Sequence, residues 1–204
     1  PVGRRGQVPG PGRSCGDDGM SNSLDIYLSK RDAIQTGDAI QWQSRSILGW
    51  LIRWRTNSEA NHTSIAIRFK EYDTERVYIL EALEHGTVLN PLSARLKKHD
   101  GKAWLLPLKA DYAYLRKPMG QWALEHVGVG YDYPGLVKQL WRKVTPNADR
   151  LFCSEYWWMA LTEAAKRMGA EKIVLEARKI LMGKAPQPAD IPKLGLTQKE
   201  IQIL

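Results

Sequence analysis

The sequence is poor in cysteine and in long apolar runs. It contains only Cys15 and Cys153, so it has neither a disulfide framework nor the clustered thiols of a zinc site. No apolar run is long enough to span a bilayer. The first residues include Arg4 and Arg5 without the apolar stretch of a signal peptide. These absences favour a cytoplasmic location by default and are consistent with a reducing compartment.

Dense blocks of basic residues are also missing, although the net charge is +8. Nucleic-acid binding would require such a block or a recognisable module, so we expect no nucleic-acid partner. Hydrophobic residues make up 43% and charged residues 25% of the chain, which is typical of a globular protein. Phenylalanine is rare, with 2 copies against 8 of tryptophan. Tryptophan supplies rigid contact area in cores and along ligand grooves.

The sequence predicts one folded domain preceded by a tail. Residues 1–19 are rich in glycine and proline and lack apolar periodicity, which predicts a flexible segment. Patterned sequence begins after Met20, a candidate for the natural start. We therefore expect a single catalytic domain over residues 20–204, a length that can bury a sizeable core.

The order of the predicted elements indicates an α+β fold. Alternating apolar and polar residues predict a small antiparallel sheet, and helical spacing predicts the elements that pack against it. Because the strands cluster before most of the helices, the order favours α+β over a doubly wound parallel sheet. A polar, proline-containing tail is expected after the last helix. The expected strands are 37–42, 63–69, 77–83, 86–90 and 103–108, and the expected helices are 46–55, 91–98, 112–127, 134–144 and 152–168.

Cys153 is the candidate nucleophile. It stands where a loop enters the predicted helix 152–168. The unpaired N–H groups and the dipole of a helix N-terminus favour a thiolate and can stabilise an oxyanion. Two other interpretations stay open at this point: Cys153 is a small buried core residue, or Ser154 caps the helix and the cysteine is incidental.

His62 is the candidate base, because it directly precedes a predicted strand that would hold it rigidly. Glu81 lies in the apolar run of the next predicted strand, where an unpaired carboxylate would be costly. If the two strands form a hairpin, Glu81 can orient the imidazole as a third catalytic group. His85 is an alternative third residue. A lone histidine is also common as a surface or core residue.

Five short motifs together resemble one family of enzymes. In chain order they are Gly37-Asp38, His62-Thr63-Ser64-Ile65, Leu80-Glu81-Ala82, Gly130-Tyr131-Asp132-Tyr133 and Phe152-Cys153-Ser154-Glu155. Their order and spacing resemble the circularly permuted papain-like cysteine hydrolases of the NlpC superfamily, the YiiX/YaeF-like group. The resemblance covers roughly residues 36 to 170.

This resemblance implies a permuted papain-like fold, with the histidine strand before the cysteine helix. It implies that Cys153 is the nucleophile, His62 the base and Glu81 the third member. Tyr131 matches a tyrosine near the oxyanion site, where its hydroxyl would donate to the developing charge. Another interpretation is that Tyr131 only caps a loop. Asp38 matches a turn motif that we interpret as structural.

The expected chemistry is cleavage of an amide bond through a thioester intermediate, in cell-wall peptides. An alternative is a lipid acyl hydrolase or acyltransferase of the lecithin retinol acyltransferase type. For that alternative, the tryptophan- and arginine-rich segment 42–54 would make peripheral contact with a membrane. A third alternative is a catalytically silent binding module. The expected substrate is a peptide or a lipid-linked acyl group, and we expect no cofactor and no metal.

Overall fold

The computed structural model describes residues 25–43, 59–71, 74–83, 86–128, 152–184 and 186–204. The tail expected at 1–19 lies outside the described residues, as do the helices expected at 46–55 and 134–144. The domain boundary proposed at Met20 therefore stays a prediction.

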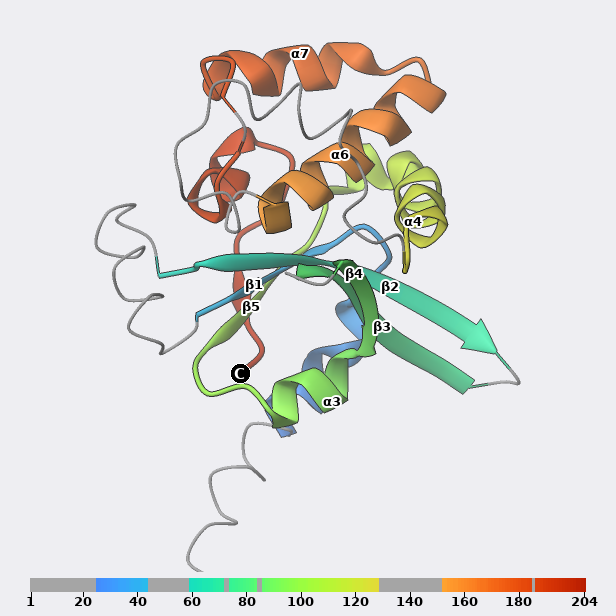
Figure 1. Cartoon of the computed structure of the whole chain (residues 1–204), viewed down its shortest axis with the longest axis vertical. Helices are drawn as coiled ribbons and strands as arrows, with labels where there is room; N and C mark the ends of the chain where they lie inside the picture. The colour runs from blue at the N-terminus through green and yellow to red at the C-terminus, as the bar shows by residue number, and fades with distance from the viewer. Residues whose placement is uncertain (1–24, 44–58, 72–73, 84–85, 129–151, 185) are drawn as a thin grey trace, which may run out of the picture.

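One six-stranded antiparallel sheet forms the centre of the protein, in the order β4-β3-β2-β1-β5-β6 (Figure 1). The long hairpin of β2 and β3 supplies its longest strands, and the expected strands at 63–69 and 77–83 lie within them. The bounds are β1 Ala39–Trp42, β2 His62–Glu71, β3 Thr74–Leu83, β4 Gly86–Pro91, β5 Ala103–Leu106 and β6 Ile201–Gln202.

Each face of the sheet packs against a different set of helices. Ile65, Ile67 and Leu80 belong to a core cluster that includes Trp157 and Leu161 of α6 (Phe152–Arg167). The neighbouring strand residues point to the opposite face, since side chains alternate along a strand. On that face, buried strand residues pack with α3 (Leu92–Lys97). Figure 1 shows α6 on one side of the sheet and α3 on the other.

The helices expected at 112–127 and 152–168 are both present, with one difference at the start of the first. The helix expected at 112–127 begins as a 3₁₀ turn, η2 (Ala110–Leu115), and continues as α4 (Arg116–Glu125). The helix expected at 152–168 is present as α6, and Gly169 follows it at a φ of 66°, as a glycine at a helix C-terminus does.

The segment expected to be a polar tail is largely structured, so that prediction is wrong. It contains α7 (Glu171–Ile180), the 3₁₀ helix η4 (Pro188–Leu194) and strand β6. Val174, Ala177 and Leu181 are buried in the same core as α6. Their spacing of three and four residues is helical, but charged residues surround them and conceal the pattern.

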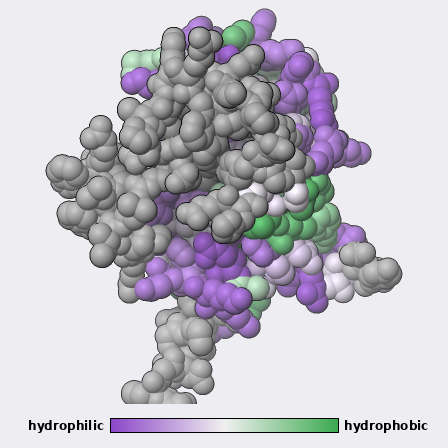
Figure 2. Space-filling model, viewed as in Figure 1, coloured by the Kyte–Doolittle hydropathy of each residue, from purple (hydrophilic) through white to green (hydrophobic). Residues whose placement is uncertain are grey.

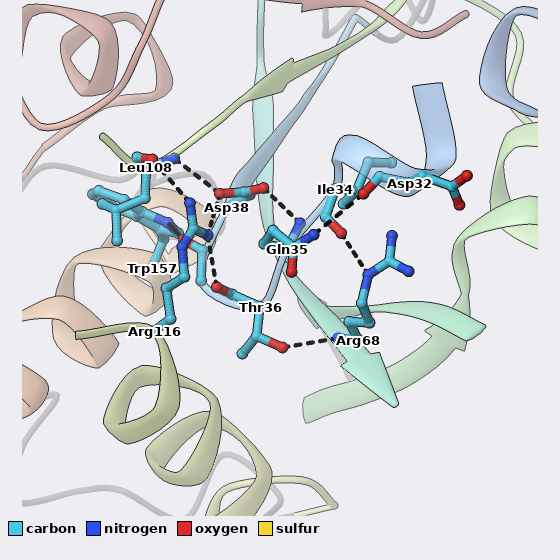
Figure 3. Close-up of polar contacts among 10 residues, drawn as sticks. Asp32, Ile34, Gln35, Thr36, Asp38, Arg68, Leu108, Arg116 and Trp157 are labelled. Carbon is cyan, nitrogen blue, oxygen red and sulfur yellow. Dashed lines mark hydrogen bonds and ion pairs between the residues drawn. The ribbon is translucent and has the colours of Figure 1, made fainter. Parts of the chain in front are cut away.

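Asp38 joins four parts of the fold at the start of β1 (Figure 3). Its side chain is fully buried. One carboxylate oxygen accepts a hydrogen bond from the backbone N–H of Gln35, at 2.7 Å. The other accepts from the N–H of Leu108 at 2.8 Å and from the guanidinium of Arg116 at 2.6 Å. The expectation that Asp38 has a structural role in a turn is confirmed, and the role extends to the chain after β5 and to α4.

Arg116 extends this network, because it also donates to the carbonyl groups of Thr36 and Leu108, both at 2.9 Å. The indole N–H of Trp157 in α6 donates to the carbonyl of Gly37 at 3.0 Å. Burial raises the pKa of Asp38, while Arg116 and the backbone N–H groups oppose that rise. The network therefore fixes α4 and α6 against the same turn.

The surface in the view of Figure 2 is mostly hydrophilic over the described residues. Apolar residues gather at the level of the sheet, over the region where β2, β4 and α4 lie in Figure 1. Within the described part of the chain, no helix has both the length and the apolar character needed to cross a membrane.

We expect Asp38→Ala to lower the free energy of unfolding by about 3 kcal/mol, because it leaves the buried end of Arg116 without its carboxylate. Urea denaturation at neutral pH measures this loss. Glu75→Gln is the matched control. Glu75 pairs with Arg68 at 2.7 Å but is 46% exposed, so we expect a cost below about 1 kcal/mol. Equal costs in the two variants would contradict the central role of Asp38.

Candidate active site

His62 and Glu81 lie next to each other on β2 and β3. The hairpin pairs Ile65 with Leu80, which brings the first residues of β2 beside the last residues of β3. The Nε2 atom of His62 lies 3.1 Å from Oε1 of Glu81. The His62 side chain is 20% exposed and that of Glu81 is fully buried. The expected proximity of the two residues is therefore present, and their catalytic roles stay predictions.

Arg95 of α3 is a second partner of the Glu81 carboxylate. Its Nε lies 3.1 Å from Oε2 and 3.3 Å from Oε1. Two donors therefore hold a carboxylate that has no access to water. A buried carboxylate in an apolar strand is costly unless it is paired in this way.

The charges around Glu81 fix the hydrogen-bonding state of His62. Burial alone would raise the pKa of Glu81, but the hydrogen bond and charge of His62 and the charge of Arg95 outweigh it, so the pKa is lowered. An ionised carboxylate can only accept hydrogen bonds. The Nε2 atom of His62 must then be the donor, which leaves the lone pair of a neutral imidazole on Nδ1. That nitrogen is the one able to accept a proton.

Trp42 and His99 support this cluster from β1 and from the residues after α3. The Arg95 guanidinium lies 4.8 Å from the centre of a Trp42 ring, in the geometry of a cation–π contact. The Trp42 indole donates to the Ser64 hydroxyl at 2.8 Å. The rings of His99 and Trp42 pack edge to face, with their centres 5.0 Å apart. Trp42 is 1% exposed, so this residue belongs to the core and is not available to a membrane surface.

Cys153 is the second residue of α6, so its backbone lies in the first turn of a 16-residue helix. Its side chain lies outside the described residues. The residues that follow it are anchored by side chains that donate to backbone carbonyls. Ser154 donates to Pro186 at 2.6 Å, Tyr156 to Ala123 at 2.7 Å, and Trp157 to Gly37 at 3.0 Å. Ser154 therefore lies inside the helix, and the interpretation that it is the N-cap is wrong.

The sheet places His62 and the middle of α6 on different faces. Leu80 and Ala82 pack in the core that contains α6, so Glu81 between them points to the face that carries α3, where it meets Arg95. His62 shares this face. His62 is the first residue of β2, so contact with the first turn of α6 would have to be made around the end of the strand. The pairing of Cys153 with His62 stays a prediction.

Glu155 lies two residues after Cys153 on the same helix. Burial raises the pKa of its carboxyl to about 7. Near neutral pH this group is therefore protonated in a large fraction of molecules. Its negative charge opposes a nearby thiolate less than an ordinary glutamate would.

Two other candidates, Tyr131 and His85, lie outside the described residues.

Arg95 was not predicted from the sequence. The signal that could have identified it is the need of Glu81 for a cationic partner, combined with a basic helix that follows the neighbouring strand. Three basic residues at the end of that helix, Arg95, Lys97 and Lys98, share this signal, so the sequence alone does not select one.

The comparisons with known proteins support the fold. No family model matches the chain, and no curated protein matches it. Among solved structures, the chain is similar to the metalloprotein YiiX from Escherichia coli O157:H7, with a TM-score of 0.51 and 19% sequence identity. The match covers 82% of this chain and 96% of that one. The protein therefore has a YiiX-like α+β fold.

The description of that neighbour as a metalloprotein raises the question of a metal site in this chain. Among the residues that the structure describes, no group of three or more His, Cys, Asp or Glu side chains could hold a metal ion. The described His–Glu pair does not fit one either, because Arg95 brings a positive charge to both oxygens of Glu81.

We expect Glu81→Gln to lower the free energy of unfolding at about pH 7 by about 3 kcal/mol, because an amide cannot accept from both partners with both of its polar atoms. The lowered pKa of Glu81 means that its contribution is present above the ordinary glutamate range and is lost as the pH falls through the folded-state value. The difference from wild type should therefore shrink in acid. Urea denaturation at neutral and at acidic pH measures it, and a difference independent of pH would contradict the assigned charge.

We expect Glu155→Gln to change the free energy of unfolding in the opposite direction from Glu81→Gln. Because burial raises the pKa of Glu155 to about 7, the folded state loses stability as the pH rises from the ordinary glutamate range through about 7. We expect the variant to be more stable than wild type by about 1–2 kcal/mol above pH 8, and equal to it below about pH 4. Parallel urea titrations at the two pH values measure the change. Lower stability of the variant at high pH would show that the carboxylate has a favourable partner.

Proposed function

We propose that the protein is a thiol-dependent hydrolase in which Cys153 is the nucleophile, His62 the base and Glu81 the group that orients the base. The observation that carries this proposal is the contact between His62 and the fully buried Glu81, at 3.1 Å. A buried carboxylate that holds a partly exposed imidazole is the arrangement used by bases that activate thiols.

Three further features support the assignment. Cys153 lies in the first turn of α6, where backbone N–H groups and the helix dipole favour a thiolate. The following turn of that helix is anchored to three separate backbone carbonyls. With Nε2 of His62 bound to Glu81 at 3.1 Å, a neutral imidazole carries its lone pair on Nδ1, the nitrogen that can take a proton.

The proposed reaction proceeds in two steps. The Nδ1 atom of His62 takes the thiol proton of Cys153, and the sulfur attacks the acyl carbon of an amide. The C–N bond then breaks, the leaving amine takes the proton from His62, and a thioester remains. In the second step, His62 takes a proton from water, the hydroxide attacks the thioester, and the thiol regains the proton as the acid is released.

The family resemblance defines the proposal more closely. It implies a permuted papain-like fold of the NlpC type, with Tyr131 as a donor to the oxyanion. It also implies amide bonds of cell-wall peptides as the substrate. A lipid-linked acyl ester is the alternative substrate, and acyl transfer to another acceptor is the alternative outcome of the second step.

The coupling between Cys153 and His62 can be measured without knowing the substrate. We expect iodoacetamide to alkylate Cys153 rapidly at about pH 6 in wild type, because a thiolate is the reactive form and a free cysteine is almost fully protonated there. In His62→Gln, the rate at this pH should fall at least about tenfold, and the pH midpoint should move toward that of an ordinary thiol. Mass spectrometry resolves Cys153 from Cys15.

The control for this experiment is His126→Gln. His126 stacks on Trp122 beside α4, with ring centres 4.1 Å apart, and has no part in the proposed reaction. Slow alkylation in wild type, or equal rates in wild type and His62→Gln, would remove the thiol mechanism and favour a silent binding module. If coupling is found, hydrolysis of muropeptides and of lipid esters by wild type and Cys153→Ala identifies the bond.

A further inference from the structure

We propose that Arg95 is a positioning residue for the candidate base, acting on His62 through the carboxylate of Glu81. This inference deepens the proposed function and rests on it for the chemical role of His62. The contact that it concerns is independent of any reaction, since it depends only on residues of β2, β3 and α3.

The contacts of Arg95 fix the orientation of the Glu81 carboxylate. Its Nε contacts both oxygens of Glu81, at 3.1 and 3.3 Å, while His62 contacts only Oε1. A carboxylate held at both oxygens cannot rotate about its terminal bond without losing a hydrogen bond to a charged donor, and such bonds are the strong ones. Arg95 therefore fixes the oxygen that His62 meets.

The stem and head of Arg95 are themselves held in place. The guanidinium stacks over Trp42 at 4.8 Å, and the Trp42 indole is bonded to Ser64 on the adjacent strand. The Arg95 side chain is 28% exposed. A flexible surface arginine would give little orientation, but a guanidinium held between a buried ring and a buried carboxylate loses little additional freedom on pairing.

The charge of Arg95 also governs how readily His62 takes up a proton. Glu81 and Arg95 together are neutral, so protonation of His62 adds a net positive charge to the cluster. Without Arg95, the buried carboxylate would face His62 uncompensated and would favour the imidazolium. His99, which follows α3, is a titratable neighbour that meets the charges of both Arg95 and Glu81. Tyr27 packs in the core on the same face of the sheet, with Arg31 and Arg68 as its charged neighbours. β1 and β4 contribute Trp42 and Val88 beside Glu81, neither of which is charged.

The test uses Arg95→Met in the full chain, because methionine keeps an apolar stem over Trp42 and removes the charge. We measure the pH titration and tautomer of His62 by NMR with labelled histidine, and assign its signal from His62→Gln. We expect wild type to carry the neutral-form proton on Nε2. In the variant, the pKa of His62 should rise by about one unit, since the nearest opposing charge is gone, and the Nδ1–H tautomer should become detectable.

Arg95→Lys and Lys97→Met are the matched variants. Lysine keeps the charge but loses the planar contact, so the pKa of His62 should stay near wild type while the tautomer preference weakens. Lys97 is an exposed residue of the same helix, and removing its charge should change neither measurement. An unchanged titration and tautomer in Arg95→Met, or equal changes in Lys97→Met, would overturn the proposal. If Arg95→Met does not fold, the tautomer ratio in Arg95→Lys decides.

The NMR test of Arg95 can succeed or fail independently of the alkylation test of the proposed function. The NMR measurement does not require a reactive cysteine, so it can succeed when Cys153 alkylation shows no dependence on His62. If both hold, the alkaline limit of the pH–rate profile should move upward in Arg95→Met by the same shift as the titration of His62. A change in rate without that shift would indicate loss of packing and would contradict the positioning role.

Discussion

The buried carboxylate of Asp38 is the constraint on which the arrangement of the sheet and the helices depends. It receives backbone N–H groups from the turn before β1 and from the chain after β5, and a guanidinium from α4. The turn that it closes also accepts the indole N–H of α6. Because a buried carboxylate without donors is costly, any arrangement that separates these segments is penalised. The position of the cysteine-bearing helix thus depends on an acid far from that cysteine in sequence.

Glu81 is a second buried carboxylate paired with an arginine, but its pairing has a different consequence. Both carboxylates are fully buried, and each contacts one arginine. The remaining partners of Asp38 are backbone groups that cannot titrate, whereas that of Glu81 is an imidazole exposed in part to water. The first network therefore fixes structure, while the second fixes a group that can gain or lose a proton. This contrast separates a structural ion pair from a candidate acid–base site.

The sequence predicted the sheet and the His62–Glu81 contact because both depend on local pattern and on the cost of an unpaired carboxylate. The register of the β2–β3 hairpin then follows from keeping Ile65 and Leu80 in the core. Arg95 was not predicted, because the basic residue that pairs with Glu81 is determined by where α3 lies against β3. Helix α7 was not predicted, because Val174 and Ala177 are its only buried residues and charged residues surround them. His62 and the middle of α6 lie on opposite faces of the sheet. This placement depends on tertiary packing, which the periodicity of the sequence does not encode.

The separations along the chain imply an order of assembly. Glu81 lies 19 residues from His62 and 14 from Arg95, within one hairpin and the helix after β4. The indole of Trp157 bonds a carbonyl 120 residues away. Because closing a longer loop costs more entropy and non-local contacts form more slowly, the candidate base and its partners can assemble on a nascent hairpin. We therefore expect the cysteine-bearing helix to dock later, on a sheet in which His62 and Glu81 are already in contact.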